Sequence, residues 1–256
     1  MLIDTHAHLQ DKDLKKDLEQ VLNRAQNAGL EKIICVGYDL ASSQEALQLA
    51  RKYRQVHAVV GIHPHDAQSL TPDVKEKIFA MARDQRVVAI GEIGLDFYRD
   101  LSPREIQRQA FREQIKMAQE IGKPIVIHDR DAHQEVMEII KAEKAGKNLG
   151  IMHCYSGALP MANELIKLGF YISFAGPLTF KNASKAHETA AKIPIDKILV
   201  ETDCPYLSPE PFRGKLNEPA NVKYVAAKLA ELRNKSIDEI AYLTNLNARK
   251  VYRIKD

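Results

Sequence analysis

The sequence predicts an α/β protein in the form of a closed (β/α)8 barrel, a TIM barrel, with extra C-terminal helices. Short apolar runs alternate with longer amphipathic segments through most of the 256 residues, and such alternation indicates parallel strands joined by right-handed crossovers. Eight apolar runs can be counted, which is the number of strands in such a barrel. The first run leads into His6-Ala7-His8 rather than into the glycine-rich phosphate loop of a doubly wound open sheet.

The expected strands and helices follow one another in a regular order. The strands cover residues 2–5, 32–36, 57–61, 87–91, 124–128, 149–153, 170–173 and 198–201. The segments between them have the periodicity of amphipathic helices and cover residues 14–28, 42–53, 72–84, 103–121, 131–144, 160–168 and 183–192. Glycine or proline stands near several joints, for example at Gly29, Gly122 and Pro194. Residues 217–255 have only helical periodicity, with a break at 234–236, and we expect them to pack on the outside of the barrel.

Composition and charge describe an ordinary globular protein. Hydrophobic residues make up 45% of the chain, so residues 1–256 can form one domain with a sizeable core. The formal net charge of +3 does not by itself indicate a nucleic-acid-binding protein.

No apolar run reaches about 18 residues, so we expect no membrane-spanning helix. The N-terminus lacks the regions of a signal peptide, and scattered cysteines without a CxxC pair are typical of the reducing cytoplasm.

Histidines and carboxylates gather at the C-terminal ends of the expected strands, where the active sites of this fold lie. In chain order they are His6, His8, His63, His65, Glu92, His128, His153, Glu201 and Asp203. A single histidine at a strand end is more often structural than a metal ligand. The prediction of a metal site therefore depends on the joint placement of these residues at one rim.

Most of these residues are expected to hold two divalent metal ions. The predicted ligands are His6, His8, Glu92, His128, His153 and Asp203. His6 and His8 are two residues apart on a strand and therefore face the same side. One tetrahedral zinc ion needs fewer ligands, whereas two ions about 3.5–4 Å apart would use all of them. Two such cations repel each other and need an anionic bridge, which Glu92 can supply.

Asp203 and Glu92 are the predicted catalytic residues. Asp203 can bind a metal ion and accept a proton from metal-bound water. Glu201 lies deeper on the same strand face, where it either orients a ligand or belongs to a buried ion pair. The metal is left open between Zn²⁺, Mn²⁺, Fe²⁺ and Mg²⁺, and the four histidines favour the softer ions over Mg²⁺.

Cations and aromatic rings in the loops after the strands could contact a substrate. They are Arg99, Arg130, Lys181, Arg213 and Lys215, with Phe97, Tyr98, Tyr155, Phe180, Tyr206 and Phe212. Guanidinium groups suit phosphate and aromatic faces can stack on an unpaired base; solvated charges and loop packing are the alternatives. Pro64 interrupts strand geometry between His63 and His65, which favours substrate-side donors over metal ligands. The residues expected on the substrate side are His63, His65, Arg130, Tyr155, Glu201 and Arg213.

Ordered motifs throughout the chain resemble those of the TatD family of metal-dependent deoxyribonucleases, among the amidohydrolase-like barrels. The resemblance runs from the first strand to about Pro219. The matching segments are Asp4-Thr5-His6-Ala7-His8, Gly61-Ile62-His63-Pro64-His65, Gly91-Glu92-Ile93-Gly94-Leu95-Asp96, Ile127-His128-Asp129-Arg130-Asp131-Ala132, His153-Cys154-Tyr155-Ser156-Gly157, Glu201-Thr202-Asp203-Cys204-Pro205-Tyr206 and Arg213-Gly214-Lys215-Leu216-Asn217-Glu218-Pro219. An HxH pair alone is a weak signal, whereas this ordered set is highly specific.

The resemblance implies a division of the metal ligands and a substrate. One ion would be held by His6, His8, Glu92 and Asp203, and the other by Glu92, His128 and His153. It also implies hydrolysis of DNA phosphodiester bonds in the 3′ to 5′ direction, with divalent metals that often include Mg²⁺. A narrow barrel mouth would admit a single-stranded end more easily than a duplex. Leu216, where many relatives carry Arg, removes one possible phosphate contact.

Three other functions stay open at this point. The same site could hydrolyse another ester, such as that of a D-aminoacyl-tRNA. The protein could bind nucleic acid without catalysis, although such a protein needs no pair of metals. It could also be a structural barrel with one zinc ion, although mixed histidine and carboxylate ligands make a poor structural site. We expect a cytoplasmic monomer or weak oligomer with no membrane partner.

Overall fold

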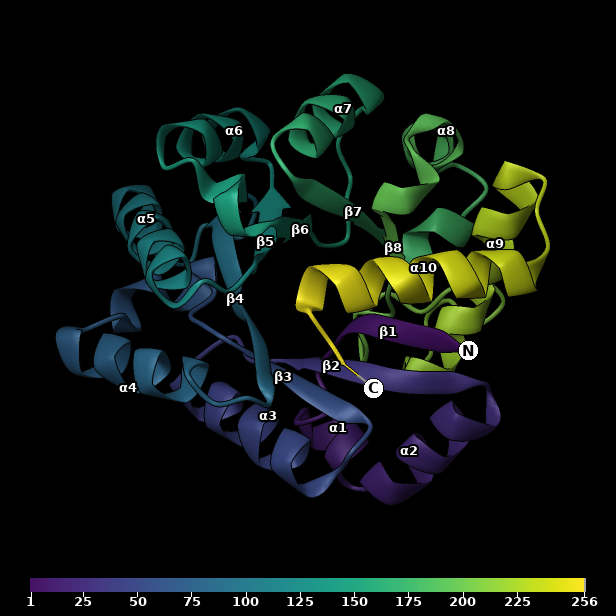
Figure 1. Cartoon of the computed structure of the whole chain (residues 1–256), viewed down its shortest axis with the longest axis horizontal. Helices are drawn as coiled ribbons and strands as arrows, with labels where there is room; N and C mark the ends of the chain where they lie inside the picture. The colour runs from purple at the N-terminus through teal and green to yellow at the C-terminus, as the bar shows by residue number, and fades with distance from the viewer. Residues whose placement is uncertain (256) are drawn as a thin grey trace.

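Eight parallel strands follow one another around a barrel, in sequence order, in this computed structural model, which describes residues 1–255 (Figure 1). The strands are β1 (Leu2–Ala7), β2 (Leu30–Val36), β3 (Val56–Val60), β4 (Val87–Asp96), β5 (Ile125–Arg130), β6 (Gly150–Met152), β7 (Phe170–Phe174) and β8 (Ile198–Val200). Hydrogen bonds just beyond β8 close the barrel. The amide of Asp203 donates to the carbonyl of His6 at 2.9 Å, and the amide of His8 donates to that of Cys204 at 2.8 Å. The predicted fold class is confirmed.

Helices surround the barrel, because each strand is followed by at least one amphipathic segment whose apolar face packs on the sheet (Figure 1). The α-helices are α1 (Lys12–Lys15), α2 (Leu18–Asn27), α3 (Leu40–Lys52), α4 (Pro72–Ala82), α5 (Arg104–Ile121), α6 (His133–Ala142), α7 (Leu159–Lys167), α8 (Ser184–Lys192), α9 (Val222–Arg233) and α10 (Ile237–Tyr252). The 3-10 helices are η1 (Pro64–Ser69), η2 (Ala145–Asn148), η3 (Gly176–Thr179), η4 (Ile195–Lys197) and η5 (Pro219–Asn221). The break predicted at residues 234–236 separates α9 from α10.

The single helix predicted for residues 14–28 is wrong, because a turn divides the segment into α1 and α2. Leu14 and Leu18 are both buried and four residues apart, so their spacing alone predicts a continuous helix. The three residues between them are charged and exposed. No burial stabilises helical geometry across them, and a helix in a globular protein depends on such burial.

Strand β4 is longer than the sequence predicts, because it continues past Gly91 to Asp96. Its pairing with β5 is irregular between Ile90 and Ile93. Two glycines permit the close approach of the two strands. A Cβ added at Gly91 would lie 2.7 Å from the side chain of Val126, and one at Gly94, where φ is 143°, would lie 2.0 Å from a β5 carbonyl oxygen. Glu92 is therefore a strand residue that points from an irregular stretch of β4.

The C-terminal helix α10 closes the N-terminal end of the barrel, where the sequence predicted packing only on the outside (Figure 1). Its residues Ala248, Val251 and Tyr252 join the apolar cluster that fills the barrel interior. The Tyr252 hydroxyl donates to the carbonyl of Thr5 at 3.0 Å. Helical periodicity defines the apolar face of a helix but not the surface that this face covers, which is why the sequence did not predict this position.

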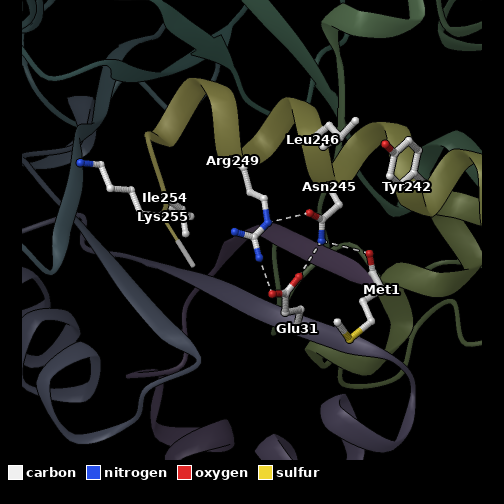
Figure 2. A pocket seen from close by; sticks show the side chains of 8 residues that line it. All are labelled: Met1, Glu31, Tyr242, Asn245, Leu246, Arg249, Ile254 and Lys255. Carbon is white, nitrogen blue, oxygen red and sulfur yellow. Dashed lines mark hydrogen bonds and ion pairs between the residues drawn. The ribbon is translucent and has the colours of Figure 1, made fainter.

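A polar network ties α10 to the first two strands at this end (Figure 2). Arg249 pairs with Glu31, and the Asn245 amide donates to Glu31 at 2.9 Å and to the carbonyl of Met1 at 3.1 Å. Tyr242 borders the same shallow pocket and is 63% exposed. Among residues 1–255, no helix combines the length and apolarity needed to cross a membrane.

Candidate metal centre

All six predicted metal ligands meet at the C-terminal end of the barrel. Glu92 lies at the middle of the cluster, because its two carboxylate oxygens face different groups of residues. Oε2 is 3.4 Å from Nε2 of His6. Oε1 is 2.8 Å from Nδ1 of His128 and 3.0 Å from Nε2 of His153. A carboxylate in this position can bridge two ions.

The other side of the cluster is formed by the first strand and the segment after the last. Asp203 Oδ1 lies 3.4 Å from Nε2 of His8 and 3.7 Å from Nε2 of His6. Among residues 1–255, His6, His8 and Asp203 form one of three groups whose ligand atoms lie within 4.8 Å of one another and could hold an ion. The backbone hydrogen bonds that close the barrel join Asp203 to His6 and His8 to Cys204, so closure of the barrel also positions these ligands.

Each of three histidines uses its second ring nitrogen within the protein. His128 Nε2 is 3.0 Å from Asp96 Oδ2, and His153 Nδ1 is 2.9 Å from Glu201 Oε1. His8 Nδ1 is 2.8 Å from the carbonyl oxygen of Val36. A histidine that binds a metal ion through one nitrogen is commonly held through the other by a carboxylate or a carbonyl. The pattern therefore matches oriented metal ligands.

His6 provides a test of whether the cluster fits a metal ion. The residue is fully buried, and neither ring nitrogen has a hydrogen-bond partner within residues 1–255. A buried polar atom without a partner costs free energy, so an imidazole in this state indicates an additional ligand. Nε2 of His6 points toward the carboxylates of Glu92 and Asp203. The donor set and this nitrogen without a hydrogen bond both fit a divalent cation.

The cluster keeps its two central carboxylates ionised. Burial acts to raise the pKa of Glu92, but the surrounding His153, His63 and His128 outweigh it and bring that pKa well below its usual value. Burial likewise acts to raise the pKa of Asp203, and the hydrogen bond from His8 with nearby histidine charges lowers it below the usual value. Both groups are carboxylates at neutral pH, as metal ligands must be.

Two residues expected on the substrate side, Glu201 and Tyr155, are enclosed by the protein, and their burial argues against direct contact with a substrate. Glu201 is 0% exposed; it accepts hydrogen bonds from the Cys154 amide at 2.7 Å and the Ser173 hydroxyl at 2.5 Å. Its Oε1 also lies 2.9 Å from Nδ1 of His153, which agrees with the first of the two roles considered from the sequence, the orientation of a ligand. Tyr155 packs in the core, and its hydroxyl donates to the carbonyl of Ala158 at 2.8 Å. Loop packing thus describes Tyr155, and stacking does not.

His63 and His65 differ from each other more than the sequence suggests. His63 is buried, its Nε2 is 3.6 Å from Glu92 Oε1, and it forms a possible metal-binding group with Glu92 and His128. The assignment of His63 to the substrate thus stays a prediction with a competing role. His65 is partly exposed, with Nε2 2.9 Å from Asp96 Oδ2.

Asp96 is the residue that sequence reasoning missed. It is 0% exposed and contacts both His65 and His128. The signal was present, because positions 92 and 96 lie on one face of a strand if the strand continues that far. Because the predicted strand ended at Gly91, Asp96 was placed outside it and was not considered as a site residue.

Exposed side chains surround the cluster at the rim. The Arg130 guanidinium lies over the ring of Tyr98 at 4.0 Å from the centroid, and that of Arg213 lies over Phe180 at 4.3 Å. Tyr206, which is 56% exposed, has its ring centroid 6.2 Å from that of His8. Arg130 is the last residue of β5 rather than a loop residue, whereas Tyr98, Phe180, Tyr206 and Arg213 lie in segments that follow strands, as the sequence predicted.

Comparison with known proteins decides the family. The profile of the family described as TatD related DNase matches residues 3–253. The chain belongs to the TatD family. It is 46% identical over 254 residues to a Bacillus subtilis TatD-family relative named uncharacterized metal-dependent hydrolase YabD, covering 99% of this chain and 100% of the relative.

Two further TatD-family relatives extend the comparison. A Klebsiella pneumoniae protein named 3′-5′ ssDNA/RNA exonuclease TatD is 32% identical over 258 residues, covering 99% of this chain and 98% of that protein. The crystal structure of YjjV, a TatD homologue from Escherichia coli, has a TM-score of 0.94 at 32% identity and covers 99% and 98% of the two chains. The chain is a metal-dependent hydrolase of the TatD type.

Proposed function

We propose that this hydrolase is a deoxyribonuclease that removes nucleotides from the 3′ end of single-stranded DNA. The observation that supports it best is the position of Glu92 between two groups of ligand atoms. A carboxylate there suits two neighbouring divalent ions, which is a common arrangement for in-line displacement at phosphorus. The name of the Klebsiella pneumoniae relative supports the same class of substrate.

Two divalent ions, such as Zn²⁺, Mn²⁺ or Mg²⁺, would share Glu92. The residues that would hold them are His6, His8, Glu92 and Asp203 on one side and Glu92, His128 and His153 on the other. When bound, such ions supply positive charge that activates water and offsets the charge developing on phosphoryl oxygens. Asp96, Glu201 and the Val36 carbonyl keep the imidazoles in place, because each occupies the ring nitrogen opposite the one that faces Glu92 or, for His8, Asp203.

Asp203 is the residue best placed to take the proton of an attacking water. Its side chain is 13% exposed, so it reaches the open mouth, whereas that of Glu201 is completely covered. Its lowered pKa keeps it a carboxylate, which is the form that can accept a proton. Glu92 faces histidines on both sides and would hold both ions.

Single strands fit the rim better than duplexes. Tyr98 and Tyr206 are 59% and 56% exposed at the mouth, and Arg130 and Arg213 stand beside aromatic rings. An aromatic side chain can stack only on a base whose face is open, and neighbouring bases cover these faces within a duplex. The exposed rings therefore favour an unpaired strand end.

The test is cleavage of a 5′-labelled single-stranded oligonucleotide by protein stripped of metal and reloaded with Mg²⁺, Mn²⁺ or Zn²⁺. We expect products that shorten one nucleotide at a time from the 3′ end and a metal content of about two ions per chain. His128→Ala, assayed in parallel, should lose metal and activity together.

The same assay separates the alternatives. Cleavage of an aminoacyl-tRNA ester without cleavage of the oligonucleotide would replace the proposed substrate. Oligonucleotide binding without cleavage under all three metals would indicate a nucleic-acid-binding protein. A content of about one zinc ion per chain with neither activity would indicate a structural site.

A further inference from the structure

We propose that Tyr98 and Arg130 form a subsite that binds one unpaired nucleobase and its neighbouring phosphate beside the metal centre. The inference rests on the proposed function, because it takes single-stranded nucleic acid as the substrate. It assigns one nucleotide of that substrate to one pair of side chains.

The two side chains are stacked and open to solvent. The Arg130 guanidinium lies 4.0 Å from the ring centroid of Tyr98, whose residue is 59% exposed. Arg130 is also exposed and forms no ion pair with any carboxylate among residues 1–255. A base can stack on the open face of the tyrosine ring. The edge of the guanidinium keeps its donors for a phosphate oxygen, which it can bind in a bidentate manner.

The pair lies at a defined height above the proposed ligands. Arg130 follows His128 by two residues on β5, so both side chains leave the same face of the strand. Two strand residues span about 7 Å. A nucleotide at Arg130 would therefore be the neighbour, along the same DNA strand, of the nucleotide whose phosphate lies at His128.

The carboxylate of Asp96 fixes the position of the loop that carries Tyr98 relative to His128, a proposed metal ligand. Oδ2 of Asp96 is 3.0 Å from Nε2 of His128. Oδ1 of Asp96 accepts hydrogen bonds from the backbone amides of Tyr98 at 3.0 Å and Arg99 at 2.7 Å. Because the two oxygens hold the histidine and the loop at once, the distance between the subsite and the metal centre is set by one residue.

Further hydrogen bonds make this loop rigid before any substrate binds. The Gln107 side chain accepts from the Asp96 amide at 2.9 Å and donates to the Ser102 carbonyl at 2.8 Å. The Ser102 hydroxyl donates to the carbonyl of His65 at 2.7 Å. A side chain on an already ordered loop loses little conformational entropy on binding. Most of the free energy of stacking therefore contributes to the affinity for the oligonucleotide.

The experiment is a double-mutant cycle between the protein and the oligonucleotide. The metal-loaded parent and Tyr98→Ala are compared on single-stranded oligonucleotides of about 10 nucleotides that carry one abasic site at successive positions from the 3′ end. We expect Tyr98→Ala to raise KM and Kd about 10-fold or more on the intact oligonucleotide. At one abasic position the parent should show the same loss and the variant no further loss.

Two control variants separate stacking from general damage. Tyr98→Phe keeps the ring and should match the parent, and Tyr242→Ala removes an exposed tyrosine from the opposite end of the barrel and should also match it. Hydrolysis of a small phosphodiester without a base should be equal in the parent and Tyr98→Ala, which shows that the metal centre is intact. An unchanged KM and Kd in Tyr98→Ala, or a loss that is independent of the abasic position, would overturn the subsite.

The outcomes distinguish this inference from the proposed function. If the parent cleaves from the 3′ end but is insensitive to Tyr98→Ala, the function stands and the subsite is wrong. If the parent binds the oligonucleotide through Tyr98, measured by fluorescence anisotropy, without cleaving it, the subsite stands and the nuclease function is wrong. A parent that neither binds nor cleaves the oligonucleotide overturns both.

Discussion

The two ends of the barrel bury different kinds of side chain. At the C-terminal end, histidines and carboxylates are enclosed close to one another, and the ring nitrogens of His6 have no hydrogen-bond partner among residues 1–255. At the N-terminal end, α10 covers the barrel interior with apolar side chains, and Arg249, Glu31 and Asn245 form a network at the surface. Barrels of this kind place chemistry at the first end and stability at the second. The predictions below test that division, because each change should affect one end only.

Asp203→Asn should have the largest effect. The amide cannot accept the proton of water, so kcat should fall about 10²–10⁴-fold, while the unfolding temperature changes little. Steady-state kinetics and thermal unfolding measure the two quantities. Asp73→Asn, on the exposed start of α4, serves as the matched control. Activity near that of the parent would refute Asp203 as the base.

Tyr252→Ala, at the N-terminal end of the barrel, should lower stability and leave turnover unchanged. The ring is 2% exposed and its hydroxyl bonds to Thr5, so its removal leaves a cavity beneath the barrel. We expect the free energy of unfolding to fall by about 3–5 kcal/mol, with kcat and metal content unchanged wherever the variant is folded. Tyr252→Phe should lose only about 0.5–1.5 kcal/mol. Loss of turnover in folded Tyr252→Ala would show that the two ends are coupled.

Glu201→Gln should weaken metal binding without removing a proposed ligand. The carboxylate orients His153, and loss of such a partner commonly lowers metal affinity about 10–100-fold. Competition with a chromophoric chelator measures this affinity independently of turnover. Glu188→Gln, on the exposed surface of α8, should bind metal as the parent does. Unchanged affinity in Glu201→Gln would contradict the orienting role.

His57 should give the smallest effect, as a pH dependence of stability. Burial, with the charges of Arg86, Lys32 and Arg249, lowers the pKa of His57 from 6.5 to about 4. The unfolded chain takes up this proton first as the pH falls, so stability present above about pH 6.5 is lost toward pH 4. Between about pH 7 and pH 5 the parent should lose about 1–2 kcal/mol more than His57→Gln, by urea unfolding. Equal losses in the two proteins would exclude this effect.

The sequence predicted most of the strands, and the meeting of the proposed ligands, for a specific physical reason. Apolar runs define strands buried on both faces, and their C-terminal ends must meet at one rim of a closed parallel barrel. His6 and Asp203, near opposite ends of the sequence, could therefore be placed together without coordinates. Their proximity in the structure agrees with that expectation.

The features that the sequence did not predict depend on tertiary packing rather than on the hydrophobic periodicity of the sequence. The continuation of β4 to Asp96 requires the close approach at Gly94, which an apolar run does not reveal. The burial of Tyr155 depends on how its loop folds back to Ala158. The position of α10 depends on which surface its apolar face meets.

Closure of the barrel has a consequence for how the enzyme matures. The two hydrogen bonds that join the start and end of the sheet involve His6, His8 and Asp203. A growing polypeptide that has not yet released Asp203 from the ribosome has neither this junction nor the complete set of proposed metal ligands. Catalytic competence therefore cannot arise gradually during synthesis, and it appears only when the last strand docks beside the first.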